Sequence, residues 1–324
     1  MDSFFALATS NLLAPTILCF ALGLAAALAR SDLALPEAAA KGISIYLLFA
    51  IGFKGGAAVS AHGFEARLAL TLLAGTMLSF ALPLVAWMIL TRFSRVDATN
   101  AAAIAGHYGS ISIVTFVAAT SLLETRGLPP EGYMVAVAAA MEAPAIISAL
   151  WLAARRAGPG ETGPGLLREV LLNGSIVLLV GAFFIGLASG PKGLLDLSSF
   201  IVAPFTGVLC LFLLDMGLVA GRSLAGSRGK LPARLLAFGL LMPPLGAAMG
   251  LALALPLGLS LGGTVLLMTL AGSASYIAVP AAMRVALPRA DAGISLTLAL
   301  GITFPFNLVL GIPLYLAAAS FALA

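Results

Sequence analysis

Apolar residues fill ten long segments of this chain, and short polar stretches separate one segment from the next. An apolar run of roughly 18 residues or more can cross a ~30 Å hydrocarbon core as an α-helix. The pattern therefore predicts an all-α polytopic membrane protein. Its predicted spans are Leu12–Ala29, Ala39–Phe53, Leu68–Leu90, Ala98–Leu123, Tyr133–Ala153, Leu171–Ser189, Phe200–Gly221, Leu235–Leu257, Gly263–Ala286 and Ala292–Leu323.

Composition supports a membrane protein. Of the 324 residues, 61% are hydrophobic and 9% are charged, and the mean hydropathy is +1.11. A soluble domain carries about 25% charged residues. The sequence begins Met1-Asp2-Ser3, without the cationic start of a cleavable signal peptide, so we expect the first span to be retained.

The chain divides into two similar halves around one long polar connection. We predict a first repeat at 1–154, a cytoplasmic connecting loop at 155–170 and a second repeat at 171–324. Four short matches recur in the same order at offsets of 163, 165, 163 and 161 residues, which chance rarely produces. They pair Gly23–Ala26 with Gly186–Ser189, Leu48–Gly52 with Leu213–Gly217, Gly109–Ser112 with Gly272–Ser275, and Met141–Pro144 with Thr303–Pro305.

Five spans in each half is an odd number, so the second half is expected to enter the membrane from the opposite side. An inverted repeat of this kind is typical of secondary transporters. Thirteen of the 17 Lys and Arg residues then fall on the side of the central loop. The positive-inside rule places that side in the cytoplasm and both termini outside. The basic residues form no stripe with interleaved aromatics, which argues against nucleic-acid binding.

Two glycine-serine clusters interrupt the fourth and ninth predicted spans. Glycine and serine are unfavourable inside a lipid-buried helix, and one interruption in each half is the pattern of helices broken around a substrate. A broken helix exposes backbone N–H groups that bind a small anion. The predicted substrate-binding residues are Gly109, Ser110, Ile111, Ser112, Gly272, Ser273, Ala274, Ser275 and Tyr276. Close helix packing by small residues is the alternative interpretation.

Glu142 and Asp215 are the carboxylates that fall deep inside predicted spans. An ionised group there costs several kcal/mol unless it is paired, and neither residue has a basic partner in its own span. We therefore predict that both bind Na⁺ or H⁺, completed by carbonyl and hydroxyl oxygens. A structural hydrogen bond to the backbone is the alternative for each.

Other polar residues within the spans have simpler explanations. His107 is expected to be a hydrogen-bonded packing residue, although a membrane hydrolase built on His107 and Ser110 is a rival hypothesis. Lys54 is expected to end the second span and reach the outer interface. Cys19 and Cys210 are expected to be packing thiols. No nucleotide, dinucleotide or Cys/His metal motif occurs, so we expect no catalytic residues and no cofactor.

Several segments resemble the SbtA-type sodium-dependent bicarbonate transporter family and occur in the same order. They are Tyr46–Gly56, Asn100–Ala105 with Tyr108-Gly109-Ser110, Gly132–Ala136, Phe212–Gly217, Ser273–Arg284 and Thr303–Asn307. The resemblance implies ten transmembrane helices in two inverted five-helix repeats, with a core domain and a gate domain. It also implies homotrimers and, as in some members of the family, a PII-like regulatory protein on the cytoplasmic face, although the central loop that would dock it is shorter than is usual in the family.

The resemblance also assigns roles to the candidate residues. Bicarbonate would bind between Gly109–Ser112 and Gly272–Ser275, and sodium would bind beside the helix crossing. The sodium candidates are then Glu142, Asp215, Asn100, Thr303 and Asn307. We therefore predict a Na⁺-coupled bicarbonate importer of the bacterial inner membrane that works by alternating access. The alternatives are a Na⁺-coupled importer of another small anion, such as a carboxylate, and a membrane anion sensor that transports nothing.

Overall fold

A computed structural model describes residues 12–62, 66–94, 96–157, 174–226, 231–276, 279–280, 283, 287 and 289–324. Within these ranges the chain forms helices and short connections, with no β-strand. The all-α prediction is therefore confirmed. Most of the central connection predicted at 155–170 lies outside the described residues.

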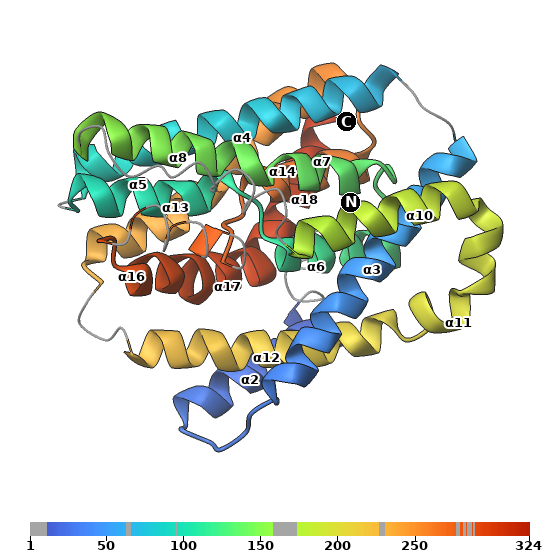
Figure 1. The fold of residues 1–324 in the computed structure, drawn as a ribbon, viewed down its shortest axis with the longest axis horizontal. Helices are drawn as coiled ribbons and strands as arrows, with labels where there is room; N and C mark the ends of the chain where they lie inside the picture. The colour runs from blue at the N-terminus through green and yellow to red at the C-terminus, as the bar shows by residue number, and fades with distance from the viewer. Residues whose placement is uncertain are drawn as a thin grey trace.

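Helices of the first half follow the predicted spans (Figure 1). The fourth and fifth predicted spans are each divided into two helices. In order, the elements are α2 (Pro15–Leu28), α3 (Glu37–His62), α4 (Ala66–Phe93), α5 (Ala98–Gly109), α6 (Ile113–Thr125), α7 (Met134–Ala140) and α8 (Glu142–Ala157).

The second half begins with α10 (Gly174–Asp196), which runs past the predicted end at Ser189 and kinks at Gly190, where φ is 62°. The last span of the second half alternates between α-helical and π-helical turns. The further elements are α11 (Ser198–Ile201), α12 (Phe205–Gly226), α13 (Ala233–Leu257), α14 (Leu261–Ala271), α16 (Ala292–Leu296), η1 (Thr297–Thr303), α17 (Phe304–Phe306), η2 (Asn307–Gly311) and α18 (Ile312–Ala322).

Eight segments of the described chain are long and apolar enough to cross a membrane, judged by length and composition. They are Glu37–Ala61, Ala66–Phe93, Ala98–Thr125, Met134–Leu152, Val177–Asp196, Ser198–Gly226, Ala233–Leu257 and Ala292–Ala322. Two shorter apolar helices, α2 and α14, lie at the first predicted span and at the start of the ninth. The chain is therefore a multi-pass membrane protein.

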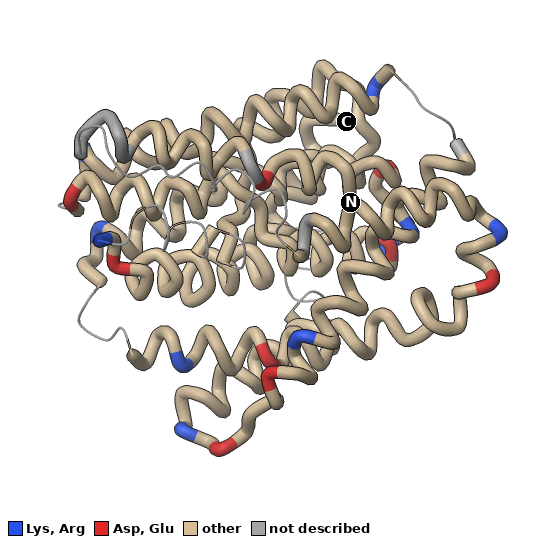
Figure 2. Tube along the Cα trace, in the orientation of Figure 1, with Lys and Arg blue, Asp and Glu red and all other residues tan. Residues whose placement is uncertain are grey.

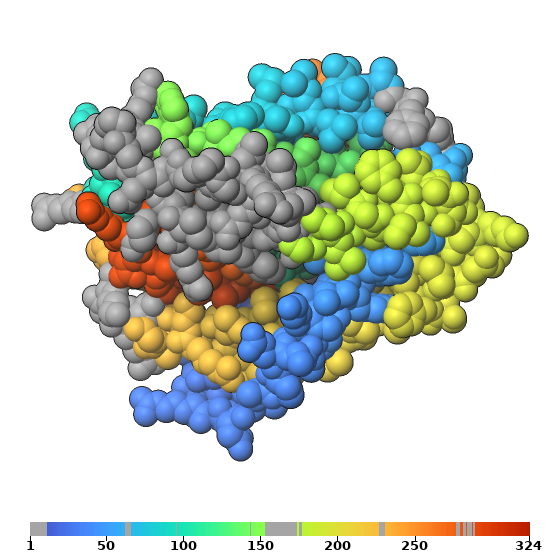
Figure 3. Space-filling view, in the orientation of Figure 1, coloured from blue at the N-terminus to red at the C-terminus, as the bar shows by residue number. Residues whose placement is uncertain are grey.

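The helices form two groups. In the four-helix group, α2 packs along α12 and α3 packs along α10, so each pair joins one helix from each half of the chain. Figure 3 shows α3 and α10 in direct contact on one face of the molecule. The central group contains α4, α5, α8, α13, α14 and the C-terminal helices, which pack on one another.

Glycines allow the paired helices of the four-helix group to approach backbone to backbone. A Cβ atom at Gly23 would collide with the carbonyl of Leu214, and one at Gly186 would collide with the carbonyl of Phe53. Small residues at such contacts allow the van der Waals packing that holds membrane helices together. These two glycines occupy matching positions in the four-part sequence repeat.

Lys54 does not end the second span, so that prediction is wrong. Helix α3 continues to His62, and Lys54 Nζ lies 2.9 and 2.8 Å from the two carboxylate oxygens of Glu124. The ammonium also lies 5.1 Å from the ring centroid of Phe205. Glu124 therefore neutralises a lysine that lies inside the helix. Most charged side chains otherwise lie near helix ends (Figure 2).

Candidate functional site

The first predicted break is present between α5 and α6. Helix α5 ends at Gly109, and Ser110 follows with extended backbone angles (φ −89°, ψ 154°). Ser112 begins α6 as its N-cap, where its Oγ accepts a hydrogen bond from the Thr115 N–H at 3.2 Å. Serine is a favourable N-cap residue because its hydroxyl satisfies a backbone N–H that the helix leaves unpaired.

The second predicted break follows α14. Gly272 ends this helix, and Ser273, Ala274 and Ser275 have no helical structure. Two hydrogen bonds stabilise the helix end. Ser273 Oγ donates to the carbonyl of Leu270 at 2.9 Å, and Asn307 Nδ2 donates to the carbonyl of Gly272 at 2.8 Å. The π-helical segment η2 therefore holds this break open through Asn307.

The two breaks meet at a crossing, formed by Gly109–Ser112 and Gly272–Ser275. His107 and Ser275 form two hydrogen bonds: His107 Nδ1 lies 2.6 Å from the carbonyl oxygen of Ser275, and the Ser275 N–H donates to the His107 carbonyl at 2.8 Å. The Ser112 N–H also donates to Ser273 Oγ at 2.9 Å. The structure therefore brings together two clusters that are about half the chain apart.

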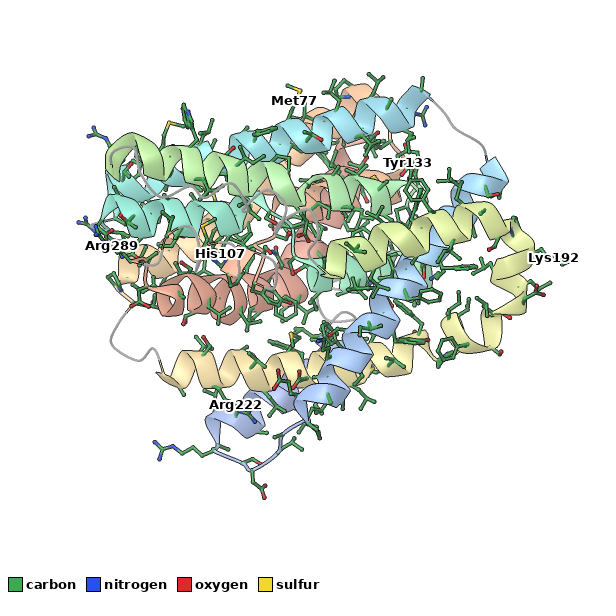
Figure 4. The ribbon with its side chains drawn as sticks, in the orientation of Figure 1. Met77, His107, Tyr133, Lys192, Arg222 and Arg289 are labelled. Carbon is green, nitrogen blue, oxygen red and sulfur yellow. The ribbon has the colours of Figure 1, made fainter. Side chains whose placement is uncertain are left out.

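His107 is a buried packing residue, as predicted (Figure 4). Its Nδ1 faces a carbonyl oxygen, so that nitrogen must carry the proton and donate. Ser110 Oγ is buried and has no hydrogen-bond partner among the described residues. The geometry therefore provides no base that activates Ser110, and the hydrolase hypothesis gains no support.

A cavity of about 630 Å³ ends at the crossing. Its exposed end carries Lys41 and Gly174, whereas Glu142 and the residues of the crossing are buried. Five predicted site residues line it: Ile111, Ser112, Glu142, Ser275 and Tyr276. The rest of the wall is largely apolar and consists of Ser44, Ile45, Leu47, Leu48, Ile113, Val117, Leu178 and Phe212.

The other predicted substrate residues lie behind this wall. Gly109 has a packing role, since a Cβ atom there would collide with the ring of Pro83 in α4. Ser273 positions the backbone of Ser112, and Gly272 accepts from Asn307. Ser110 and Ala274 are buried and do not line the cavity. Only Ser112, Ser275 and Tyr276 therefore present polar side chains of the predicted set to the cavity.

Glu142 is the carboxylate that reaches the cavity. It begins α8 directly after Met141, whose carbonyl accepts a hydrogen bond from Ser79. Glu142 is 2% exposed, and its Oε2 has no hydrogen-bond partner among the described residues. An ionised carboxylate is stable in such a place only with a counter-charge, so this oxygen can accept a cation.

Asp215 and Asn100 are not at the cavity. Asp215 lies on α12 and is buried away from the cavity lining, although its neighbour one turn earlier, Phe212, forms part of that wall. Asn100 lies in the first turn of α5, about 15 Å along the helix from Ser110. Its Oδ1 accepts from the Asp291 N–H at 2.7 Å, and its Nδ2 donates to Asp97 at 2.6 Å.

Thr303 and Asn307 lie near the crossing but are occupied by structural hydrogen bonds. Thr303 Oγ1 donates to the Gly239 carbonyl at 2.7 Å and pairs with the Tyr108 hydroxyl at 2.7 Å. Asn307 Oδ1 accepts from the Tyr315 hydroxyl at 2.7 Å. Both residues therefore support the break.

Sequence reasoning missed three residues that shape the site: Ser79, Tyr315 and Lys41. Ser79 holds the Met141 carbonyl next to Glu142, Tyr315 bonds Asn307 beside the second break, and Lys41 marks the exposed end of the cavity. Tyr315 follows Asn307 by about two helical turns, a spacing that places both side chains on one face. That spacing is the feature of the sequence that could have predicted the pairing of Tyr315 with Asn307. No feature of the sequence predicts the pairing of Ser79 with Met141.

Within the described ranges, no three His, Cys, Asp or Glu side chains gather as a metal cluster. Carbonyl and hydroxyl oxygens are hard donors that could complete the coordination of a cation at Glu142.

Comparison with known proteins identifies the family. A family model described as the Na⁺-dependent bicarbonate transporter superfamily matches residues 15–320. A search of curated proteins finds no match.

Proposed function

The chain belongs to the Na⁺-dependent bicarbonate transporter superfamily, and we propose that it imports bicarbonate together with Na⁺ by alternating access. It is a sodium-dependent transporter by family and not an enzyme. The observation that carries the proposal is the cavity that ends at the crossing, with Ser112 and Ser275 beside the buried carboxylate of Glu142.

Bicarbonate is proposed to bind at the closed end of the cavity. The first turn of α6 points its backbone N–H groups toward the crossing, and the helix dipole adds partial positive charge there. The hydroxyls of Ser112, Ser275 and Tyr276 can donate to anion oxygens or accept from the acidic hydrogen. This arrangement binds an anion without a buried Lys or Arg.

Na⁺ is proposed to bind at Glu142, beside the anion. Moving one anion into a cell that is negative inside costs about 2.3 kcal/mol per 100 mV. One co-transported Na⁺ cancels this electrical cost, and its concentration gradient then drives uptake. Na⁺ at Glu142 would also neutralise a carboxylate that otherwise repels the substrate.

The two ends of α3 differ, since the cavity is open at one end and an ion pair lies near the other, and this difference supports alternating access. The cavity opens beside Lys41 and Gly174, while Lys54 and Glu124 form an ion pair between α3 and α6 near the opposite end of α3. Moving the central group against the four-helix group would exchange the open and closed ends. In this proposal they are the core and gate domains, and the open end faces the cytoplasm.

An inverted repeat, with halves at 1–154 and 171–324, is part of the same proposal. Asp97 and Ser260 are the N-caps of α5 and α14 and lie 163 positions apart, the offset that also relates Gly109 to Gly272. The pairing of α2 with α12 and of α3 with α10 is also what a twofold relation would produce. Ten transmembrane helices, a homotrimer, a PII-like partner and the inner-membrane location remain predictions from the resemblance.

The test is uptake of ¹⁴C-labelled bicarbonate into proteoliposomes at fixed pH, with an inward Na⁺ gradient compared with an equal K⁺ gradient. Accumulation that requires Na⁺ would support both substrate and coupling. Equal uptake in the two gradients would contradict coupling, and no uptake in either would contradict bicarbonate as the substrate.

A further inference from the structure

The cavity that ends at the crossing is far larger than bicarbonate requires. Its volume is about 630 Å³, and one water molecule occupies about 30 Å³ of the liquid. Bicarbonate has only four non-hydrogen atoms, so it would leave most of this space to water. Cavities of this size are typical of sites for organic ligands.

The wall of the cavity favours an apolar ligand body. Leu48 from α3, Val117 from α6, Leu178 from α10 and Phe212 from α12 line it from four directions. An inorganic anion gains nothing from these side chains, whereas a hydrocarbon body gains free energy by leaving water to contact them.

The charged residues at the two ends of the cavity determine which sign of charge a ligand can carry. Lys41 lies at the exposed end and forms no ion pair within the described part of the chain. Its positive charge attracts anions to the opening and repels organic cations. Glu142 lies at the closed end, where Na⁺ can bridge its carboxylate to an anionic group beside Ser112 and Ser275.

We propose that this cavity binds organic monocarboxylates that carry an apolar body of several carbon atoms. The carboxylate lies at the crossing beside Na⁺, and the body extends toward Lys41 along Leu48, Leu178 and Phe212. This inference rests on the proposed function, because both place the anionic group at the same crossing.

The proposal predicts an affinity that rises with chain length and then stops rising. Each methylene that becomes buried should strengthen binding about two- to fourfold. Helix α3 rises about 10 Å between Lys41 and Leu48, which limits the length of chain that fits inside. We expect the gain to level off between hexanoate and octanoate, and we expect binding to require Na⁺.

Binding is measured by equilibrium dialysis of the purified protein with ¹⁴C-labelled acetate, butyrate, hexanoate, octanoate and dodecanoate, in NaCl and in KCl. The test variant is Leu178→Gln, which places an amide in the apolar wall. The matched control is Leu195→Gln, on the same helix but 73% exposed and outside the cavity. We expect Leu178→Gln to weaken hexanoate binding at least fivefold and acetate binding less than twofold, with Leu195→Gln unchanged.

Four results would overturn the inference. Equal affinity for acetate and hexanoate would show that the apolar wall contributes nothing. A gain that continues to dodecanoate, or no loss of hexanoate binding in either leucine variant, would indicate partition into detergent. Labelled bicarbonate uptake, measured separately in proteoliposomes, tests the proposed function by itself. Sodium-driven uptake without hexanoate binding would refute this inference and leave the proposed function intact.

Discussion

His107 and Ser275 bond to each other in both directions, one through a side chain at 2.6 Å and one through the backbone at 2.8 Å. They lie 168 positions apart, yet they fix the backbone of the second break against the end of α5. The cavity residues Ser275 and Tyr276 lie on that backbone. The alignment of the two breaks should therefore depend on an imidazole that does not itself line the cavity.

His107→Phe should reduce bicarbonate uptake at least tenfold. The phenyl ring keeps the bulk but leaves the buried Ser275 carbonyl without a side-chain donor, which costs about 1–3 kcal/mol. His107→Asn, which offers an amide donor, should recover part of the uptake. Labelled uptake and thermal denaturation of both variants check this. Wild-type uptake by His107→Phe would contradict a role for the side-chain bond.

Glu142→Gln should raise the Na⁺ concentration needed for half-maximal uptake at least tenfold, because the neutral amide cannot balance a cation. Asp215→Asn is the matched control, and it should change that concentration less than threefold, since Asp215 does not line the cavity. The measurement is uptake as a function of Na⁺ concentration. A larger effect at Asp215 than at Glu142 would reverse this assignment.

Lys54→Gln removes the ion pair with Glu124 and should make it easier to open the transporter at the end opposite Lys41. The ion-pair side chains are 21% and 37% exposed, so water screens them and their contribution is about 1 kcal/mol or less. We expect labelling of an Ile45→Cys reporter at the cavity opening, in a background without native cysteines, to fall at most about fivefold, the factor that corresponds to about 1 kcal/mol. The charge swap Lys54→Glu with Glu124→Lys should restore labelling. Failure of the swap, with normal folding, would argue that the pair does not close this end.

Asn307→Leu should destabilise the protein by about 2–4 kcal/mol. The change removes the donor to Gly272 and the acceptor of the Tyr315 hydroxyl, and each buried partner left unsatisfied costs about 1–3 kcal/mol. Tyr315→Phe, which removes only the hydroxyl bond and leaves the Asn307 amide on the Gly272 carbonyl, should cost less. Thermal denaturation in detergent measures both. Equal stability of the leucine variant and the wild type would show that these bonds do not hold the break.

Asp97 should stabilise the fold only when it is ionised. Partial desolvation acts to raise the pKa of Asp97, but hydrogen bonds from Asn100 and from the Thr99 N–H outweigh it, so the pKa lies below its usual value. A group with a depressed folded-state pKa stabilises the protein above its unfolded pKa of about 3.9, and this stabilisation is lost as the pH falls through the folded value. The stability difference between wild type and Asp97→Ala should therefore shrink as the pH falls below about 4. A difference that is constant with pH would contradict this cap.

Eight of the ten predicted spans correspond to segments that are long and apolar enough to cross a membrane, and these spans and both helix breaks could be predicted from the sequence because they depend on local composition. Gly109–Ser112 and Gly272–Ser275 stand out in apolar surroundings, and their repetition at one offset indicated a shared role. Glu142 was recognised because a buried acid is rare in a membrane span. These signals are visible without knowing which helices touch.

The positions of the sodium candidates in the fold could not be predicted in the same way, and their roles remain predictions. Asp215 and Asn100 have suitable oxygen atoms, but helix packing places them away from the cavity. The partner of Lys54 lies 70 positions away, so nothing near Lys54 indicated that its helix would continue. Whether a polar residue binds a ligand or a neighbouring helix is decided by tertiary contacts, which a single sequence does not contain.

The glycine contacts between paired helices have a mechanical consequence. At Gly23 and Gly186 one backbone rests directly on another, so no side chain lies between the helices to change rotamer or shear. Each pair of helices should therefore move as a rigid unit and bend mainly at kinks in its helices. The kink at Gly190 and Pro191, just beyond Gly186, is one place where α10 can bend without separating from α3.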